Sequence, residues 1–360
     1  MSITQEQVLD ALRTVIDPDL HRDLVTLKMI KEVVIDGATV AFTLDLTTPA
    51  CPMKDKIEGD CRAAVSQIDG VGEIKINITA TVRQNQSRGV EQISLPTVKN
   101  IIAVASGKGG VGKSTVSANL ACALAQTGAK VGLLDADIYG PSIPMIMGVE
   151  GAQLEVDESR QMLVPIERYG VEIISMGFLT RATSAVIWRG PMVSKAIQQF
   201  LRDVRWGEID YLIVDLPPGT GDAQLTLSQA IPITGVVVVM TPQDVAASVA
   251  VKAIAMFRKL DVPILGIVEN MSYFVCPTCN ARHEIFSNGG GRHAAELLET
   301  PFLGEIPLHG NIRAEADEGT PTVVISPDSA EAQAFHAVAS EVARQASIAV
   351  RKQPVPLSMA

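Results

Sequence analysis

A glycine-rich loop carries the clearest chemical signal in this sequence. Its nine residues are Gly107, Lys108, Gly109, Gly110, Val111, Gly112, Lys113, Ser114 and Thr115. The spacing is that of the phosphate-binding motif G-x-x-x-x-G-K-[ST], and it follows an apolar run at 101–105 that predicts a strand. Glycine allows successive backbone N–H groups to turn toward an anion, and the N-terminus of the next helix adds further donors. The loop therefore predicts a nucleotide site in which Lys113 reaches the terminal phosphates and the Ser114 hydroxyl binds magnesium.

Two predicted strands that end in carboxylates support a nucleotide site. The apolar run at 211–214 leads into Asp215, the position expected of an aspartate beneath the magnesium ion. The run at 131–134 leads into Asp135 and Asp137, and Asp137 is a candidate for positioning the attacking water. An aspartate after a strand is more often a turn or capping residue, so these assignments depend on the phosphate loop.

A close pair of cysteines, Cys276 and Cys279, is the second candidate for chemistry. Two thiolates at this spacing can hold one metal centre, but they supply only half of a four-thiolate shell. Three other interpretations are open at this point. The pair could bind zinc with His283 as a further ligand, it could be a redox dithiol, or it could have no chemical role.

The early lysine of the loop, Lys108, makes a family resemblance specific. The loop resembles the deviant Walker A ATPases, which include nitrogenase iron protein, the Min and Par partition ATPases and the Mrp/ApbC iron–sulfur carriers. The resemblance implies that Lys108 reaches across a dimer interface to the partner's phosphates, that Asp137 positions water and that Asn270 contacts adenine. The segment from Asp215 to Asp222 and the cysteine pair are similar to the Mrp/ApbC group in particular.

The same resemblance implies how a single cysteine pair could hold a cluster. If Lys108 brings two subunits face to face, a twofold axis can place two copies of Cys276 and Cys279 around one [4Fe–4S] cluster. The expected protein is a homodimeric ATPase that uses ATP and Mg²⁺ and passes a labile cluster to apoproteins, with cluster assembly scaffolds as further partners. The alternatives are a partition or positioning scaffold ATPase and an ATPase with a structural zinc site.

The elements that must position these residues predict an α/β fold after residue 98. Apolar runs without alternation are typical of parallel strands buried on both faces, and here they alternate with helical stretches. The expected strands lie at 101–105, 131–134, 173–176, 211–214, 236–240 and 264–268, and the expected helices at 113–126, 192–204, 245–259 and 329–347. This order predicts a doubly wound, mainly parallel sheet of the P-loop NTPase type.

Residues 1–83 predict a separate small α+β domain. A capping box at Thr4 opens a helix that is expected to reach residue 15, and a second helix is expected at 52–67. Strands are expected at 30–35, 39–46 and 73–82, the first two joined by a hairpin turn. The remaining predictions are a linker at 84–97, an ATPase domain at 98–350 and a loose tail at 351–360.

The small domain resembles the domain associated with metal–sulfur cluster assembly, which makes Cys51 a possible transfer thiol. Cys51 precedes the expected helix at 52–67, where the helix dipole would lower a thiol pKa. A partly buried cysteine without this role is the alternative. Cys61 and Cys122 lie on helical faces among small apolar residues, so core packing is expected for both.

Composition excludes several other classes of function. The net charge of -10 and the aromatic content of 4% argue against a nucleic-acid partner. The apolar runs are too short to span a bilayer, and the first residues show no secretory pattern, so no membrane partner is expected. Five cysteines without a disulfide pattern favour reduced thiols and a cytoplasmic location. The stretch 181–191 is a candidate for a dimer face.

Overall fold

The computed structural model describes residues 3–85, 93–138, 140–159, 161–178, 198–219 and 221–351, apart from the side chains of 222, 223, 226 and 244–248. The chain divides into two compact units, Met1–Arg83 and Gln84–Ala360. Each unit has its own buried apolar core.

The first unit is a three-stranded sheet with two helices. Its elements are α1 (Gln5–Leu12), β1 (Ile30–Asp36), β2 (Thr39–Leu46), α2 (Lys54–Ser66) and β3 (Glu73–Ala80). Strand β2 lies in the middle, antiparallel to β1 and parallel to β3. The capping box at Thr4 is formed, but α1 ends at Leu12 rather than at residue 15. The prediction was too long because the chain tightens there into turns in which Thr14 and Val15 bond three residues back.

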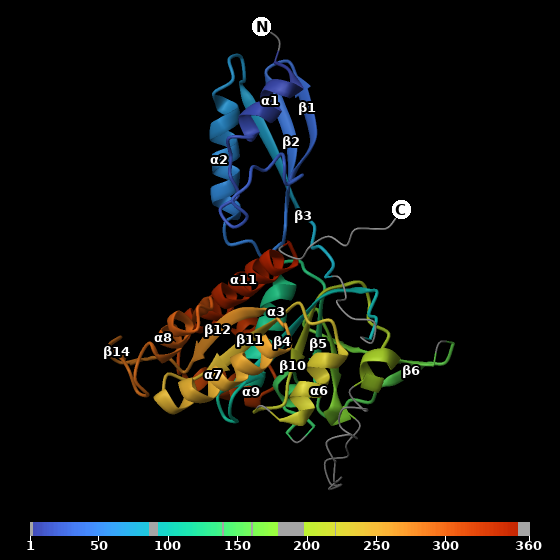
Figure 1. Ribbon diagram of the computed structural model, residues 1–360, viewed down its shortest axis with the longest axis vertical. Coiled ribbons are helices and arrows are strands. Elements are labelled where there is room, and N and C mark those ends of the chain that lie inside the picture. The colour runs from blue at the N-terminus through green and yellow to red at the C-terminus, as the bar shows by residue number, and fades with distance from the viewer. Residues whose placement is uncertain are drawn as a thin grey trace. The chain divides into compact units, whose positions relative to one another are not determined.

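The second unit is built on an eight-stranded sheet (Figure 1). Its strands are β4 (Val98–Ser106), β5 (Val131–Asp135), β8 (Ile166–Arg168), β9 (Val171–Ser175), β10 (Ile209–Asp215), β11 (Gly235–Met240), β12 (Ile264–Asn270) and β15 (Phe302–Ile306). The order across the sheet is β15-β12-β11-β4-β10-β5-β9-β8, and all neighbours are parallel except β8 and β9. The predicted doubly wound, mainly parallel sheet is therefore confirmed.

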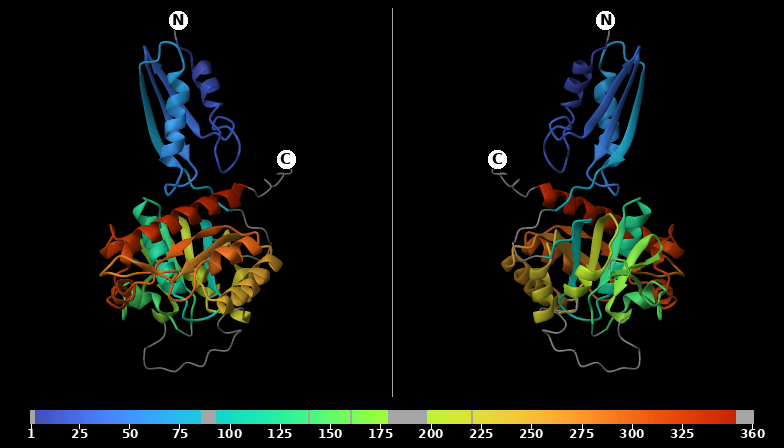
Figure 2. Two further views of the ribbon diagram at one scale, coloured as in Figure 1. Left: turned by 90° about the vertical axis from the view of Figure 1, so that its left-hand side faces the viewer. Right: turned by 90° about the vertical axis from the view of Figure 1, so that its right-hand side faces the viewer.

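Helices cover both faces of this sheet. The described helices of this unit are α3 (Lys113–Gln126), α4 (Ile143–Ile146), α6 (Asp222–Ala230), α7 (Asp244–Lys259), α8 (Gly290–Leu297), α9 (Gly310–Asp317), α10 (Thr322–Ile325) and α11 (Ala330–Arg351). Helices α3 and α11 pack against each other on one face, while α7 and α8 pack together on the other. Figure 2 shows these two layers on either side of the strands. Among the described residues, no helix combines the length and the apolar character needed to cross a membrane.

Several elements were not predicted from the sequence. Strand β8 and the strands β6 (Glu155–Asp157), β7 (Met162–Val164), β13 (Phe274–Val275) and β14 (Arg282–His283) have only two or three residues each. Within the predicted linker, Asn85 N–H donates to Lys99 O and Ile93 N–H to Ala230 O, so the described part of the linker is bonded to the second unit. The possible dimer face at 181–191, residues 192–197 of an expected helix and the tail from 352 onward lie outside the described residues.

Candidate functional site: a nucleotide pocket and a cysteine hairpin

The phosphate loop occupies the turn from β4 into α3, as its motif predicts. Gly112 has φ +79°, a left-handed conformation that favours glycine, and a Cβ there would collide with the side-chain amide of Asn270. Asn270 lies at the end of β12 and donates from Nδ2 to the Val111 carbonyl at 2.8 Å. The loop and the asparagine named by the family resemblance are therefore in direct contact.

A buried ion pair lies directly beneath the loop. Lys113 Nζ is 2.7 Å from Asp215 Oδ2, with the two side chains 6% and 0% exposed. Ser114 and Ser117 each donate a hydroxyl hydrogen bond of 2.6 Å to the same carboxylate. Lys113 thus neutralises the carboxylate that was predicted to serve magnesium. The Ser114 and Asp215 oxygens are hard ligands of the kind magnesium prefers, so the predicted pair fits the ion.

Asp135 and Asp137 lie beside this pair. Asp135 is opposite Asp215 in the parallel pairing of β5 with β10, and both are fully buried. Burial in the sheet raises the pKa of Asp135 to about 7, and the nearby Asp215 charge acts in the same direction. Asp137 lines the pocket, and its Oδ1 accepts a hydrogen bond from Gly140 N–H at 3.3 Å.

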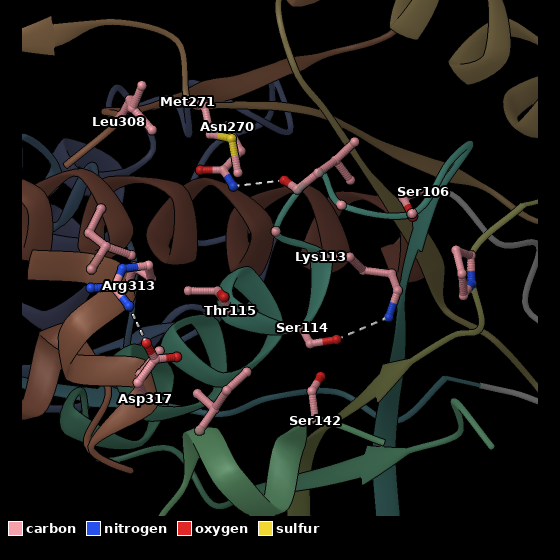
Figure 3. Close-up of a pocket in the computed structure, with 18 of the residues that line it drawn as sticks. Ser106, Lys113, Ser114, Thr115, Ser142, Asn270, Met271, Leu308, Arg313 and Asp317 are labelled. Atoms are coloured by element: carbon pink, nitrogen blue, oxygen red, sulfur yellow. Dashed lines mark hydrogen bonds and ion pairs between the residues drawn. The ribbon is translucent and has the colours of Figure 1, made fainter. Parts of the chain in front are cut away.

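These side chains surround a pocket of about 420 Å³, a volume typical of small-molecule sites. Figure 3 shows Lys113, Ser114 and Ser142 at one end and Asn270 toward the other. Sequence reasoning missed the far wall, which consists of Met271, Pro307, Leu308, His309, Ile312 and Arg313. This wall is mostly apolar and is held partly by α9, where Arg313 pairs with Asp317 at 2.5 Å.

Lys108 lies at the rim of the pocket with its ammonium held within its own chain. Its Nζ donates to Gln243 Oε1 at 3.3 Å, and the same oxygen accepts from Thr241 Oγ1 at 2.7 Å. Lys108 is half-exposed, and the Gln243 amide that it contacts is uncharged. Because hydrogen bonds to charged groups are stronger, a phosphate would compete well with Gln243 for the ammonium.

Cys276 and Cys279 lie in the loop of a short hairpin formed by β13 and β14. Cys276 N–H donates to Ala281 O at 2.9 Å, and Asn280 N–H donates to Cys276 O at 2.8 Å. Backbone hydrogen bonds from Thr278 and Cys279, and then the Cys279 thiol, lower the pKa of the Cys276 thiol. Cys276 is half-buried and Cys279 is exposed, so an external partner has access to both sulfurs.

The zinc alternative adds His283 to the two cysteines as a further ligand. His283 pairs with Phe274 in the strands below the loop, and the described part of the chain holds no group of three or more His, Cys, Asp or Glu side chains suited to a metal ion. Cys61 and Cys122 are fully buried, and burial raises the pKa of each to about 12, which confirms their packing role. Cys51 is half-buried and packs at the edge of the first core, and its transfer role stays a prediction.

Comparison with known proteins decides the family. A model of the family described as NUBPL iron-transfer P-loop NTPases matches residues 97–343, and one described as iron-sulfur cluster assembly protein matches residues 5–76. The chain belongs to the NUBPL iron-transfer P-loop NTPases. It is 51% identical to an iron-sulfur cluster carrier protein of Synechocystis over 96% of this chain and 99% of that one. It is 52% identical to one of Deinococcus radiodurans over 95% and 96%.

Solved structures agree with this membership. A nucleotide-binding protein of Archaeoglobus fulgidus in complex with ADP is 43% identical, covers 62% of this chain and 87% of its own, and has a TM-score of 0.56. The MinD cell division ATPase of Pyrococcus furiosus is 24% identical over 68% of this chain and 98% of its own, with a TM-score of 0.53, and shows the fold alone. This iron-transfer NTPase is therefore a P-loop ATPase, and the resemblance to the carriers is confirmed.

The lowered pKa of Cys276 gives a testable difference in reactivity within this NTPase. Because thiolate is the reactive form, Cys276 should be alkylated by iodoacetamide at pH 7 at least about tenfold faster than buried Cys61 or Cys122. Its alkylation rate should reach a plateau at a lower pH than the rate of an ordinary thiol, whose pKa is about 8.5. Mass spectrometry of each cysteine peptide across pH 5–10 measures both. If the alkylation rate of Cys276 reaches half its maximum at a pH above the ordinary thiol pKa, the hydrogen bonding described for Cys276 is contradicted.

Proposed function

We propose that this NTPase is a homodimeric carrier that holds a labile [4Fe–4S] cluster between two copies of the Cys276–Cys279 hairpin and transfers it to apoproteins. The carrying observation is the hairpin itself, which presents two accessible sulfurs and no third ligand among the described residues. Two thiolates are half of a cluster's usual shell, and a twofold axis supplies the other half. Relatives over nearly the whole chain are iron-sulfur cluster carrier proteins, which supports the proposal.

The roles proposed for the pocket follow from the same geometry. Lys113 binds the terminal phosphates, Ser114 and Asp215 hold magnesium, and Asp137 orients the attacking water. The phosphate loop supplies backbone donors, and the Asn270 amide contacts the base. Lys108 leaves Gln243 to reach the partner's phosphates. When bound, magnesium would offset charge on the phosphates, while Lys113 would move from Asp215 to the nucleotide.

A short segment supports coupling between ATP and the cluster. Only Met271, Ser272 and Tyr273 separate Asn270 at the pocket from Phe274 at the start of the hairpin. Tyr273 O accepts from Leu308 N–H at 2.7 Å, and Leu308 is part of the pocket wall. A nucleotide that displaces Asn270 or Leu308 would move the base of the hairpin. We place the carrier in the cytoplasm, where its thiols stay reduced.

Anaerobic reconstitution with ferrous iron and sulfide tests the proposal. Wild-type protein should bind about four iron and four sulfide per dimer, and Cys276→Ala or Cys279→Ala should bind almost none. Cys122→Ala is the matched control, because it removes a buried thiol outside the hairpin and should keep the full amount. Bound zinc without sulfide, or iron retained without Cys276, would defeat the carrier function.

The same preparation tests acceptor transfer. Loaded protein should restore an apo iron–sulfur acceptor, and Cys51→Ser should slow the restoration if Cys51 is a transfer thiol. Equal rates for Cys51→Ser and wild type would remove that role and leave cluster binding untouched.

A further inference from the structure

Ser175 occupies a position that the motifs do not explain. Three polar residues lie side by side at the carboxyl ends of adjacent strands: Asp215 on β10, Asp135 on β5 and Ser175 on β9. All three are fully buried, in a sheet whose other strand residues are mostly apolar. Buried polar groups need hydrogen-bond partners within the protein, so the partners of each hydroxyl and carboxyl oxygen in this row can be identified.

The hydrogen bonds show what Ser175 does for its neighbour. Its hydroxyl donates to Asp135 Oδ2 at 2.9 Å and accepts from Gly177 N–H at 2.9 Å. Asp135 in turn accepts from Asp137 N–H at 3.1 Å on Oδ1 and from Ile143 N–H at 3.3 Å on Oδ2. Among the described residues, Ser175 is the side chain that donates to Asp135, whereas the other two donors are backbone groups. The hydroxyl therefore fixes the orientation of the Asp135 carboxyl.

Asp135 in turn accepts hydrogen bonds from the backbone of the loop that carries Asp137. The two backbone donors are at the start of the loop, at Asp137, and at its end, where Ile143 begins α4. Asp137 lines the pocket, whereas Ser175 does not. We infer that Ser175 is a positioning residue for ATP hydrolysis, acting through Asp135 to hold the Asp137 loop in the geometry that the reaction needs.

This inference rests on the proposed role of Asp137, and it separates turnover from binding. Ser175 has no contact with the phosphate loop among the interactions described, so its loss should leave nucleotide affinity intact. A shift of about 1 Å in a positioned group can cost about 100-fold in rate. Ser175→Ala should therefore lower kcat by about 10- to 100-fold with KM for ATP and Kd for ADP within about twofold of wild type.

A matched variant controls for lost stability. Thr234 is also fully buried, and its hydroxyl accepts from Ile101 N–H at 3.1 Å and donates to Asn100 Oδ1 at 3.3 Å, near the amino ends of the central strands β4 and β11. Thr234→Val removes that hydroxyl and should lower Tm as Ser175→Ala does, while kcat stays near wild type. Ser175→Thr, which keeps a hydroxyl, should recover most of the lost kcat.

Asp137→Asn is measured alongside to separate the two ideas. If Asp137→Asn hydrolyses ATP normally, the role proposed for Asp137 fails and this inference fails with it. If Asp137→Asn is inactive but folded Ser175→Ala keeps kcat within about twofold, the inference alone is overturned. The inference is also overturned if Thr234→Val loses as much kcat as Ser175→Ala.

Discussion

Replacing Lys113 with alanine is expected to lower kcat/KM for ATP by about 100- to 1,000-fold, the usual cost of removing a donor aimed at developing charge. The structure adds a second expectation. Lys113 is the cation paired with Asp215, and neither side chain is accessible to solvent to any useful extent. Breaking such a pair leaves a buried charge and costs about 3–5 kcal/mol, so the nucleotide-free variant should also unfold at a clearly lower temperature.

A double variant separates these two effects. Lys113→Met with Asp215→Asn removes both charges while keeping similar volumes, and buried pairs replaced in this way often cost little stability. The double variant should therefore regain most of the lost Tm and none of the ATPase activity. Calorimetry and phosphate release on the wild type and both variants measure this. Wild-type hydrolysis by Lys113→Ala, or a stability loss that persists in the double variant, would contradict the account.

Lys108→Ala should lower hydrolysis by about 100-fold or more if the lysine acts on the partner's phosphates as a finger supplied in trans. Mixing two inactive variants distinguishes a lysine that acts on the partner subunit from one that acts within its own subunit. Lys108→Ala subunits keep an intact pocket, while Lys113→Ala subunits keep Lys108. With random pairing, half of the dimers are mixed and one of their two pockets is complete, so an equal mixture should recover about one quarter of wild-type activity.

The control mixture pairs Lys108→Ala with a Lys108→Ala/Lys113→Ala double variant, in which no subunit supplies the lysine. That mixture should remain inactive. If the first mixture shows only the average of its two components, Lys108 acts within its own subunit, where it already contacts Gln243. The proposed role of Lys108 across a dimer interface would then be wrong, whereas the assignment of the nucleotide pocket would be unaffected.

Local signals explain what could be predicted from the sequence. The phosphate loop is a continuous motif whose backbone geometry depends on its own glycines, and Asp215 and Asp137 follow apolar runs that are typical of buried parallel strands. Asn270 came from the family resemblance, and its contact with Val111 joins residues 159 positions apart, which no local pattern reveals. The site was therefore predicted as residue types at strand ends, without the contacts between them.

The far wall of the pocket was missed for a physical reason. Apart from Met271, this wall follows β15, a short edge strand that includes Gly304 at φ +143° and the half-buried Glu305. A five-residue strand with so little burial lacks the apolar run that marked the others. Ser175 was missed because a serine at a strand end gains meaning only from its register with Asp135. The cysteine hairpin has two-residue strands, below the length at which alternation can be recognised.

The place of β4 in the sheet has a consequence for how the protein is made. It is the first strand of its unit to be synthesised, yet it lies in the centre of the sheet. Its two neighbours, β10 and β11, begin only after residue 208. At about 5–20 residues per second, the roughly 100 residues between them take about 5–20 s to synthesise. During that time an apolar strand has both edges unpaired, the condition that favours pairing with other chains. The strand that leads into the phosphate loop thus stays unpaired longest during synthesis. The nucleotide site is incomplete until β10 and its Asp215 have been made, when more than half of the chain has been translated.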